Sequence, residues 1–251
     1  MSARSVKWQY AVLLLLAALL FVSEEAEAIS PEWTYQTGDQ WSDGVAVDIS
    51  GDGDYIAAGS NDGKVYLFKS NSNSPVWTYD VDDDVKTIAI SADGEYIVFG
   101  TNDDDGKVHL LGKTSSTPLW SYSVGDDVRS VAISPDGEYI AAGTEDVLLF
   151  DKDSSTPFRT YDFDGGVYSS AVYGLSISAD GKYVAAGSLN DYVYLLDKDS
   201  STPLWSYETG GNVDSVDISA DGEYLVIEGV DRAFRLDRIG LTTTAEDRQE
   251  K

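Results

Sequence analysis

The chain contains the stretch Val131-Ala-Ile-Ser-Pro-Asp-Gly-Glu-Tyr-Ile-Ala-Ala-Gly-Thr144, and four other segments repeat it with few changes. Each copy has a serine at the same place, which marks the repeat. The marker serines are Ser50, Ser91, Ser134, Ser178 and Ser219, at intervals of 41, 43, 44 and 41 residues. A period of this length, in units that read as strands, is typical of repeat proteins built from small β-sheets.

Each repeat is predicted to contain four short strands. In the third copy the first strand covers 131–134, and the Asp-Gly that follows suits a tight turn. The second strand, 139–143, contains small residues that allow neighbouring sheets to approach closely, and 147–150 is the third. The fourth strand begins with proline and in most copies reads Pro-x-Trp-x-Tyr. Proline at that position is compatible with the outer edge of a sheet.

The fourth strand of the last repeat is found at the other end of the chain. No Pro-x-Trp-x-Tyr segment follows Leu236, whereas Pro31-Glu-Trp-Thr-Tyr35 precedes the first repeat. An N-terminal strand that completes the last sheet would close a ring and remove its open edges. We therefore predict an all-β fold: a five-bladed β-propeller of four-stranded antiparallel blades, with the last blade closed by the N-terminal strand. An open array of separate sheets is the alternative.

Residues 31–237 resemble two families of repeat proteins. The third copy, with its Leu-Leu-Phe-Asp third strand, resembles a WD repeat, and Pro203-Leu-Trp-Ser-Tyr207 is similar to strands in the pyrroloquinoline-quinone-type (PQQ-like) repeats of exported proteins. Both resemblances imply a β-propeller. The Gly-His pair of the WD repeat is absent, and Phe68-Lys69 and Leu111-Gly112 stand where Trp-Asp belongs. Most WD-repeat propellers also have seven blades, so a ring of five is a departure.

The N-terminus has the features of an export signal. Arg4 and Lys7 precede the apolar run 11–22, and Ala26-Glu-Ala28 fits a cleavage site. An uncleaved membrane anchor is the alternative, and in both cases the repeats are exported, as a secreted, periplasmic or cell-surface domain. The predicted domains are a signal peptide at 1–28, the β-propeller at 29–237 and a polar tail at 238–251.

Composition limits the choice of partners. The chain has no cysteine, so disulfides and thiolate chemistry are excluded. Its formal net charge of −27 argues against nucleic acid and anionic membrane surfaces, because both require positive charge on the protein. A basic protein or a glycan is the expected partner, and we expect the chain to be a monomer.

Acidic residues concentrate in two sets of loops. In a propeller, the loops from fourth to first strands and from second to third strands open on the same face. The spacing from the fourth-strand tyrosine to the marker serine is 12 residues in three repeats, but it is 15 residues at 35–50 and 17 residues at 161–178. Longer loops on one face of a repeat protein often mark its binding side. Ordinary variation in loop length is the alternative. The predicted binding residues are Asp43, Asp84, Asp127 and Asn212 around the central channel, Trp41, Tyr168 and Tyr173 in the long loops, and Asp62, Asp104 and Asp191 in the second set.

Little in the sequence supports catalysis or a metal centre. His109 is the only histidine and falls at a packing position of a third strand. Asp48-Ile-Ser-Gly-Asp-Gly-Asp54 and the copy at 217–223 resemble calcium loops. The first aspartate is missing from the other copies, however, which favours a hairpin turn. Calcium at these loops or at the channel mouth stays an alternative, and no other cofactor is expected.

These observations favour an exported, non-enzymatic binding or scaffold module that uses an acidic loop face. One alternative is a carbohydrate-active enzyme, a glycoside hydrolase or lyase, with catalytic carboxylates in the channel. The aspartates of this chain recur from blade to blade, whereas a catalytic pair is expected to be unique. A structural cell-surface protein is the other alternative.

Overall fold

The computed structural model describes residues 30–38, 45–102, 105–163, 171–229 and 232–237. Contacts divide the chain into two units, Met1–Thr34 and Tyr35–Lys251, and all nineteen strands of the described residues lie in the second. These residues contain no helix long and apolar enough to cross a membrane. The predicted signal peptide and the polar tail lie outside the described residues.

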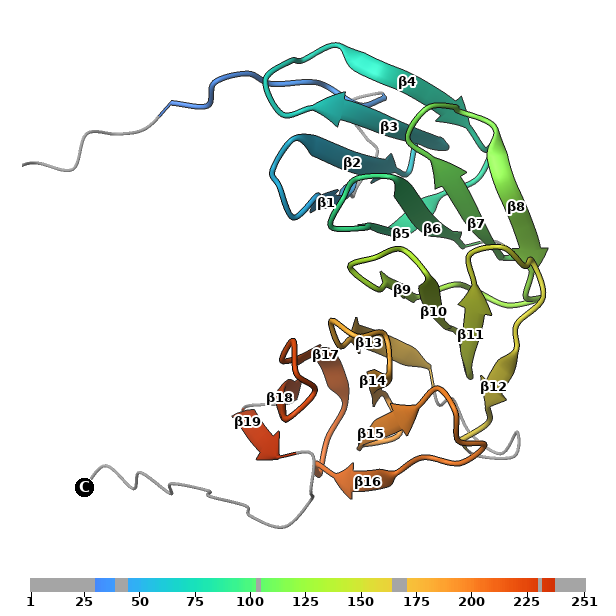
Figure 1. Cartoon of the computed structure of the whole chain (residues 1–251), viewed down its shortest axis with the longest axis vertical. Coiled ribbons are helices and arrows are strands. Elements are labelled where there is room, and N and C mark those ends of the chain that lie inside the picture. The colour runs from blue at the N-terminus through green and yellow to red at the C-terminus, as the bar shows by residue number, and fades with distance from the viewer. Residues whose placement is uncertain (1–29, 39–44, 103–104, 164–170, 230–231, 238–251) are drawn as a thin grey trace, which may run out of the picture. The chain divides into compact units, whose positions relative to one another are not determined.

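The strands form five antiparallel sheets in chain order (Figure 1). The first contains β1 (Val45–Ile49), β2 (Tyr55–Ser60), β3 (Lys64–Lys69) and β4 (Pro75–Asp80). The second contains β5 (Val85–Ile90), β6 (Tyr96–Thr101), β7 (Lys107–Gly112) and β8 (Pro118–Ser123). The third contains β9 (Ser130–Ile133), β10 (Tyr139–Gly143), β11 (Val147–Asp151) and β12 (Arg159–Tyr161). The fourth contains β13 (Val172–Ile177), β14 (Tyr183–Ser188), β15 (Tyr192–Asp197) and β16 (Trp205–Glu208), and the fifth β17 (Val213–Ile218), β18 (Tyr224–Gly229) and β19 (Arg232–Asp237).

The repeated Ser-x-Asp-Gly segment is the turn between the first and second strands of every sheet. Ser134 Oγ donates to Asp136 Oδ1 at 2.6 Å, and the backbone N–H of Tyr139 donates to Ser134 Oγ at 3.0 Å. Gly137 has a φ of 74°, in the left-handed region that glycine adopts most easily. All five copies make the same serine–aspartate bond. The motif recurs because it forms this hairpin.

The core lies between successive sheets. Each of the four junctions contains a separate apolar cluster, and at the first junction Ala57 and Leu67 pack against Ile88 and Phe99. The small residues of the second strands permit this close approach, as predicted. A Cβ atom added to Gly100 would lie 2.3 Å from Val128 of the next sheet.

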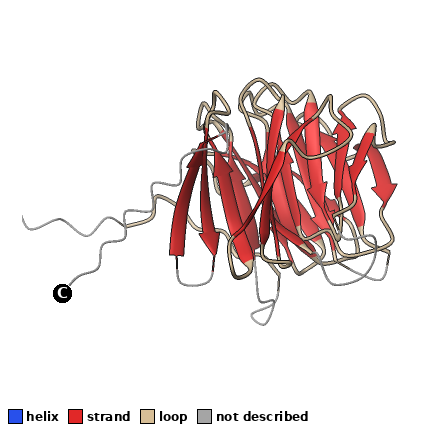
Figure 2. Cartoon of the chain, turned by 90° about the horizontal axis from the view of Figure 1, so that it is seen from below, coloured by secondary structure: helices blue, strands red, loops and turns tan. Residues whose placement is uncertain are grey.

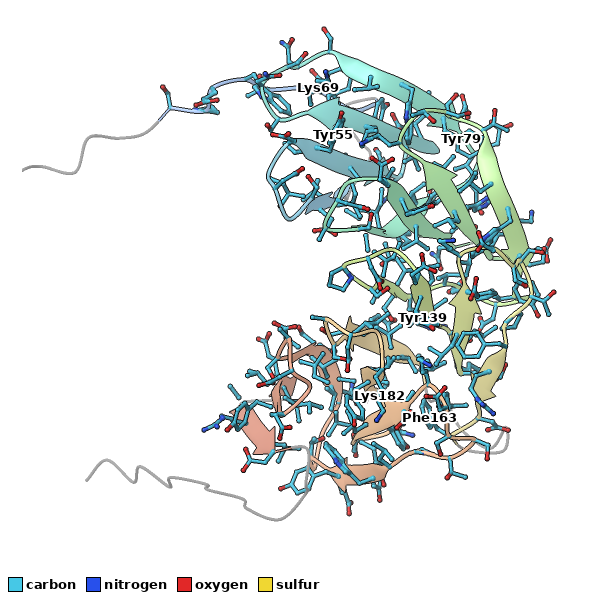
Figure 3. All side chains as sticks on the ribbon, viewed as in Figure 1. Tyr55, Lys69, Tyr79, Tyr139, Phe163 and Lys182 are labelled. Atoms are coloured by element: carbon cyan, nitrogen blue, oxygen red, sulfur yellow. The ribbon has the colours of Figure 1, made fainter. Side chains whose placement is uncertain are left out.

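Aromatic residues of the outer strands extend these junctions. Tyr79 of β4 is labelled in Figure 3. Its ring packs against Phe99 and His109 of the second sheet, with ring centroids 6.2 and 6.3 Å apart. Phe163, just after β12, stacks on Tyr194 of the fourth sheet at 3.9 Å. The fourth strand of one sheet therefore covers the third strand of the next.

The predicted closure of the last sheet by an N-terminal strand is not found. In the part of the chain that the structure describes, β19 has no fourth strand beside it, and residues 30–38 contain no strand. Tyr35 instead packs edge-on against Tyr66 and Phe68 of β3, with centroids 5.3 and 5.0 Å apart. The fifth sheet also has polar side chains, Glu228 and Arg235, at register positions where the other sheets have small or apolar residues buried by a neighbour.

Candidate binding face

Both sets of acidic loops lie on the same side of the sheets, because successive strands of each sheet run in opposite directions. Figure 2 shows the strands from the side, with loops at both ends. Backbone bonds join them within a repeat: the N–H of Val81 donates to Gly63 O, that of Val124 to Gly106 O, and that of Thr209 to Asp191 O, at 2.8 to 2.9 Å. We call this side the loop face. Its described residues are 60–63, 80–84, 102, 105–106, 124–127, 129, 144–146, 162, 173, 189–191, 208–212 and 214, together with Lys64, Lys86 and Lys107.

The loop face has more carboxylates than described cations. Lys64 lies 3.9 Å from Asp80, and Lys107 lies 3.6 Å from Asp105. Lys86 and Arg129 make two further sets of ion pairs. The exposed carboxylates of this face include Asp80, Asp82, Asp105, Glu145, Asp162, Glu208 and Asp214. The carboxylates of this set outnumber these four cations.

Asp84, predicted at the channel mouth, lies beside a lysine. Lys86 Nζ is 3.0 Å from Asp84 Oδ2 and donates to Asn61 Oδ1 at 3.2 Å. The lysine thereby connects a loop of the first set with a loop of the second set. Asp84 is thus not an isolated carboxylate.

Asp127 forms the centre of a larger cluster. Arg129 Nη1 donates to Asp127 Oδ2 at 2.8 Å. The Asn102 side-chain amide lies 2.7 Å from both Asp127 oxygens, and it donates to them in the orientation that turns its nitrogen toward Asp127. Asp126 Oδ1 lies 3.9 Å from Arg129 Nη2. Burial opposes the charge of the guanidinium, but the bond to Asp127 and the nearby Tyr173 and Asp126 outweigh it and raise the pKa of Arg129. This cluster joins the second sheet to the third.

Tyr173 is brought to the same cluster by the fourth sheet. The guanidinium carbon of Arg129 lies 5.8 Å from the centre of the Tyr173 ring, and Tyr173 is 44% exposed. Asp127, Arg129 and Tyr173 therefore place a carboxylate, a cation and an aromatic face side by side. A partner that reaches this part of the loop face meets all three groups.

Asp62 and Asp191 have local partners. Asp62 Oδ2 accepts a bond from Tyr66 O–H at 2.8 Å, and burial, followed by this bond, raises the pKa of Tyr66. Asp191 has a φ of 70° and occupies the turn position that Gly63 has in the first sheet. Asn212 is exposed just before β17. The predicted residues Trp41, Asp43, Asp104 and Tyr168 lie outside the described residues.

Sequence reasoning missed Lys86 and Arg129. Each follows its aspartate by two residues at the entry of an innermost strand, and residues two apart in a strand share a side. The charge pattern Asp-x-Lys and Asp-x-Arg was the available signal. A count of carboxylates alone therefore overestimates how acidic the inner positions are.

The carboxylates of the Ser-x-Asp-Gly turns lie at the opposite ends of the strands. The bond from Ser178 lowers the pKa of Asp180, and the bond from Ser50 lowers the pKa of Asp52. Asp48, the first residue of the calcium-like motif, accepts the backbone N–H of Ile90 at 2.9 Å. Three or more metal-ligating side chains do not come together anywhere in the described ranges. These oxygens are engaged in turns and sheet-to-sheet contacts.

Repeated four-stranded antiparallel sheets with their loops on a common face define a β-propeller repeat protein, as predicted. A family model described as outer membrane protein assembly factor BamB matches residues 25–166, over half of the chain, and the chain belongs to this family of PQQ-like repeat proteins. A model described as WD domain, G-beta repeat matches residues 157–197. No curated protein matches the chain. Repeat domains of these families typically mediate protein interaction or scaffolding and are generally non-enzymatic.

Proposed function

We propose that the chain is an exported, non-enzymatic binding module whose loop face binds a basic segment of a partner protein. The observation that carries this proposal is the excess of carboxylates over cations on that face. A face of one sign attracts segments of opposite charge and accelerates their association. Loops on rigid sheets are also well placed to present such groups.

The nature of the partner is supported by the family and by composition. The matching family model is described as an outer membrane protein assembly factor, which is a role among other proteins outside the cytoplasm. The basic start of the chain, its apolar run and the Ala-Glu-Ala segment support export of this chain as well. A basic protein segment therefore fits both the charge of the loop face and the family.

Binding of an oligolysine peptide to the purified chain tests this function. One variant combines Asp82→Asn, Asp83→Asn and Asp214→Asn on the loop face. Exposed ion pairs contribute about 0.5 kcal/mol each, so we expect binding to weaken roughly tenfold. Asparagine tolerates the positive φ of 57° at Asp82, so the loop is expected to keep its shape.

A variant with the same change of net charge provides the control. It combines Asp54→Asn, Asp153→Asn and Asp199→Asn, which lie on the side of the Ser-x-Asp-Gly turns. We expect this control to lose less than about threefold in affinity, since the change acts only through long-range charge. Equal losses in the two variants would mean that the loop face is not the binding surface. Binding of neutral glycans instead of the peptide would favour the carbohydrate alternative.

A further inference from the structure

The outer face of the fifth sheet is open. In each of the other four sheets, the equivalent face is covered by the following sheet. Val226 of β18 is 52% exposed, whereas the residues at the same position of the other four sheets are at most 1% exposed. Those residues are Ala57, Val98, Ala141 and Ala185, each covered by the following sheet. In the described part of the chain, no sheet follows the fifth.

Two residues make this face unsuitable for another sheet of the same kind. Glu228 stands at the register position of Gly59, Gly100, Gly143 and Gly187, and Arg235 stands at that of Leu67, Leu110, Leu149 and Leu195. At Gly59, Gly100 and Gly187, even a Cβ atom would lie 2.3 to 2.4 Å from a valine of the next repeat, and at Gly143 it would lie 2.8 Å from Val172 O. The much larger Glu228 excludes such packing. The fifth sheet thus has the atypical outer face expected of a terminal repeat.

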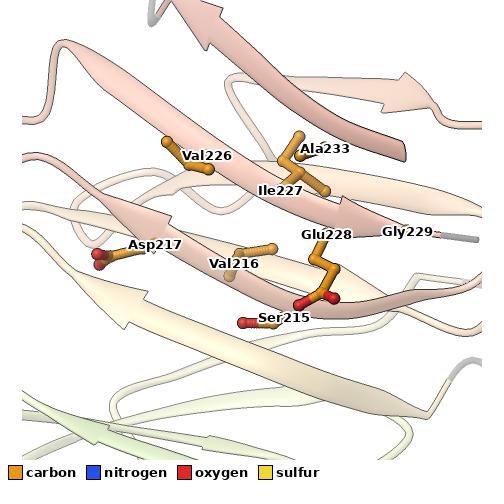
Figure 4. Close-up of a pocket in the computed structure, with 8 residues that line it drawn as sticks. All are labelled: Ser215, Val216, Asp217, Val226, Ile227, Glu228, Gly229 and Ala233. Carbon is orange, nitrogen blue, oxygen red and sulfur yellow. The ribbon is translucent and has the colours of Figure 1, made fainter. Parts of the chain in front are cut away.

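The fifth sheet also has a groove (Figure 4). Its volume is about 470 Å³, and its exposed lining combines the apolar residues Val226 and Ala233 with the polar residues Ser215, Asp217 and Glu228. Val216 and Ile227 also border the groove, but their side chains are buried toward the fourth sheet. The lining therefore combines apolar contact with two carboxylates. Asp217 is oriented by Ser176, whose Oγ donates to Asp217 Oδ1 at 2.8 Å.

Arg235, which stands opposite Val226 on this face, is engaged with residues outside the groove. Arg235 of β19 lies over the ring of Tyr224, with the guanidinium carbon 4.2 Å from the ring centre. Its Nη2 is also 3.8 Å from Asp237 Oδ1. Arg235 does not line the groove, so the charge that Asp217 and Glu228 place there is negative.

We propose that this groove is a second interaction surface, which binds a partner segment with alternating basic and apolar side chains. The apolar residues of the segment would contact Val226 and Ala233, and its lysine or arginine would pair with Asp217 and Glu228. Apolar contact supplies affinity, and the carboxylates select the charge of the segment. The groove lies on a different sheet from the Asp127 cluster, so the two surfaces can be tested separately.

Fluorescence anisotropy with a labelled peptide, Lys-Val-Lys-Thr-Val-Lys, tests the groove on the full chain. The combined change Asp217→Asn and Glu228→Gln is expected to weaken binding roughly fivefold. The separate change Val226→Ser is expected to weaken this peptide about threefold or more but to leave oligolysine binding unchanged. All three positions are exposed, so the variants are expected to fold as the wild type does.

Matched loop-face changes, Asp82→Asn with Asp83→Asn, distinguish this inference from the proposed function. If these changes weaken the peptide as much as the groove changes do, the groove is not its site and the inference fails. If the groove changes have no effect, the inference fails while the loop-face proposal stands. If the groove changes reduce the affinity for the peptide more than the loop-face changes do, the groove is its binding site. This conclusion does not depend on whether oligolysine binds the loop face.

Discussion

At the scale of single residues, His109 shows how burial determines what a titratable group can do. Its ring stacks on Phe99 with centroids 4.6 Å apart, and its Nδ1 lies 2.7 Å from Ser121 Oγ. Only 4% of the residue is exposed, and burial lowers its pKa to about 4. The histidine is therefore neutral at pH 7 and belongs to the packing between the first and second sheets, as the sequence predicted.

The low pKa of His109 predicts that protonation destabilises the fold. The unfolded histidine binds a proton near its ordinary pKa of 6.5, whereas the folded one does so only near 4. The unfolded state thus binds more protons between these values, and the free energy of unfolding falls as the pH decreases through this window, by about 3 kcal/mol in total. His109→Leu places there the residue found at the equivalent Leu148, and it should remove this term.

Urea unfolding at pH 7 and at pH 4.5 provides the measurement. The variant is expected to lose about 2 kcal/mol less than the wild type on acidification. Carboxylates titrate in both proteins, so their contribution largely cancels in the comparison. An identical loss in the two proteins would show that His109 does not titrate as its burial implies.

At the scale of elements, the outer face of the fifth sheet differs from the four internal junctions in the residues at equivalent register positions. Glycine and leucine at these positions let a sheet accept its neighbour, whereas Glu228 and Arg235 prevent it. The first sheet has the opposite property: Val47 and Ile49 of β1 are 66% and 54% exposed, although their equivalents in β5 are buried. An apolar first face and a polar last face do not match each other.

Replacing both polar residues should make the last face match the first. We expect the double variant Glu228→Gly, Arg235→Leu to associate head to tail, with the fifth sheet of one copy on β1 of another. Sedimentation velocity at several concentrations would show species whose size increases with concentration, whereas the wild type is expected to stay monomeric. Thr78→Leu, which adds a leucine on the exposed side of β4, is the control. A double variant that sediments like this control would rule out the steric role of Glu228 and Arg235.

At the scale of the whole molecule, the fold could be predicted because its signals are local and repeated. The Ser-x-Asp-Gly turn and the small residues of the second strands act within one repeat or between neighbours, so five copies confirm one another. Ring closure, in contrast, depends on the last repeat alone. Glu228 and Arg235 depart there from the pattern that the other repeats share, and a prediction made from the shared pattern does not take them into account. The binding residues were harder to predict because their charge balance depends on cations such as Arg129, which only the strand geometry brings to Asp127.

Hydrogen–deuterium exchange of the full chain, with and without a basic probe peptide, tests the binding side of the molecule most directly. Exchange reports on each backbone amide, and a bound segment slows exchange where it covers the loops. We expect protection at 80–84, 105–106, 124–127 and 144–146, which form the loop face, and unchanged exchange at the Ser-x-Asp-Gly turns. Protection confined to those turns, or the absence of protection at a saturating peptide concentration, would show that the acidic loops are a solvated surface and not a binding site.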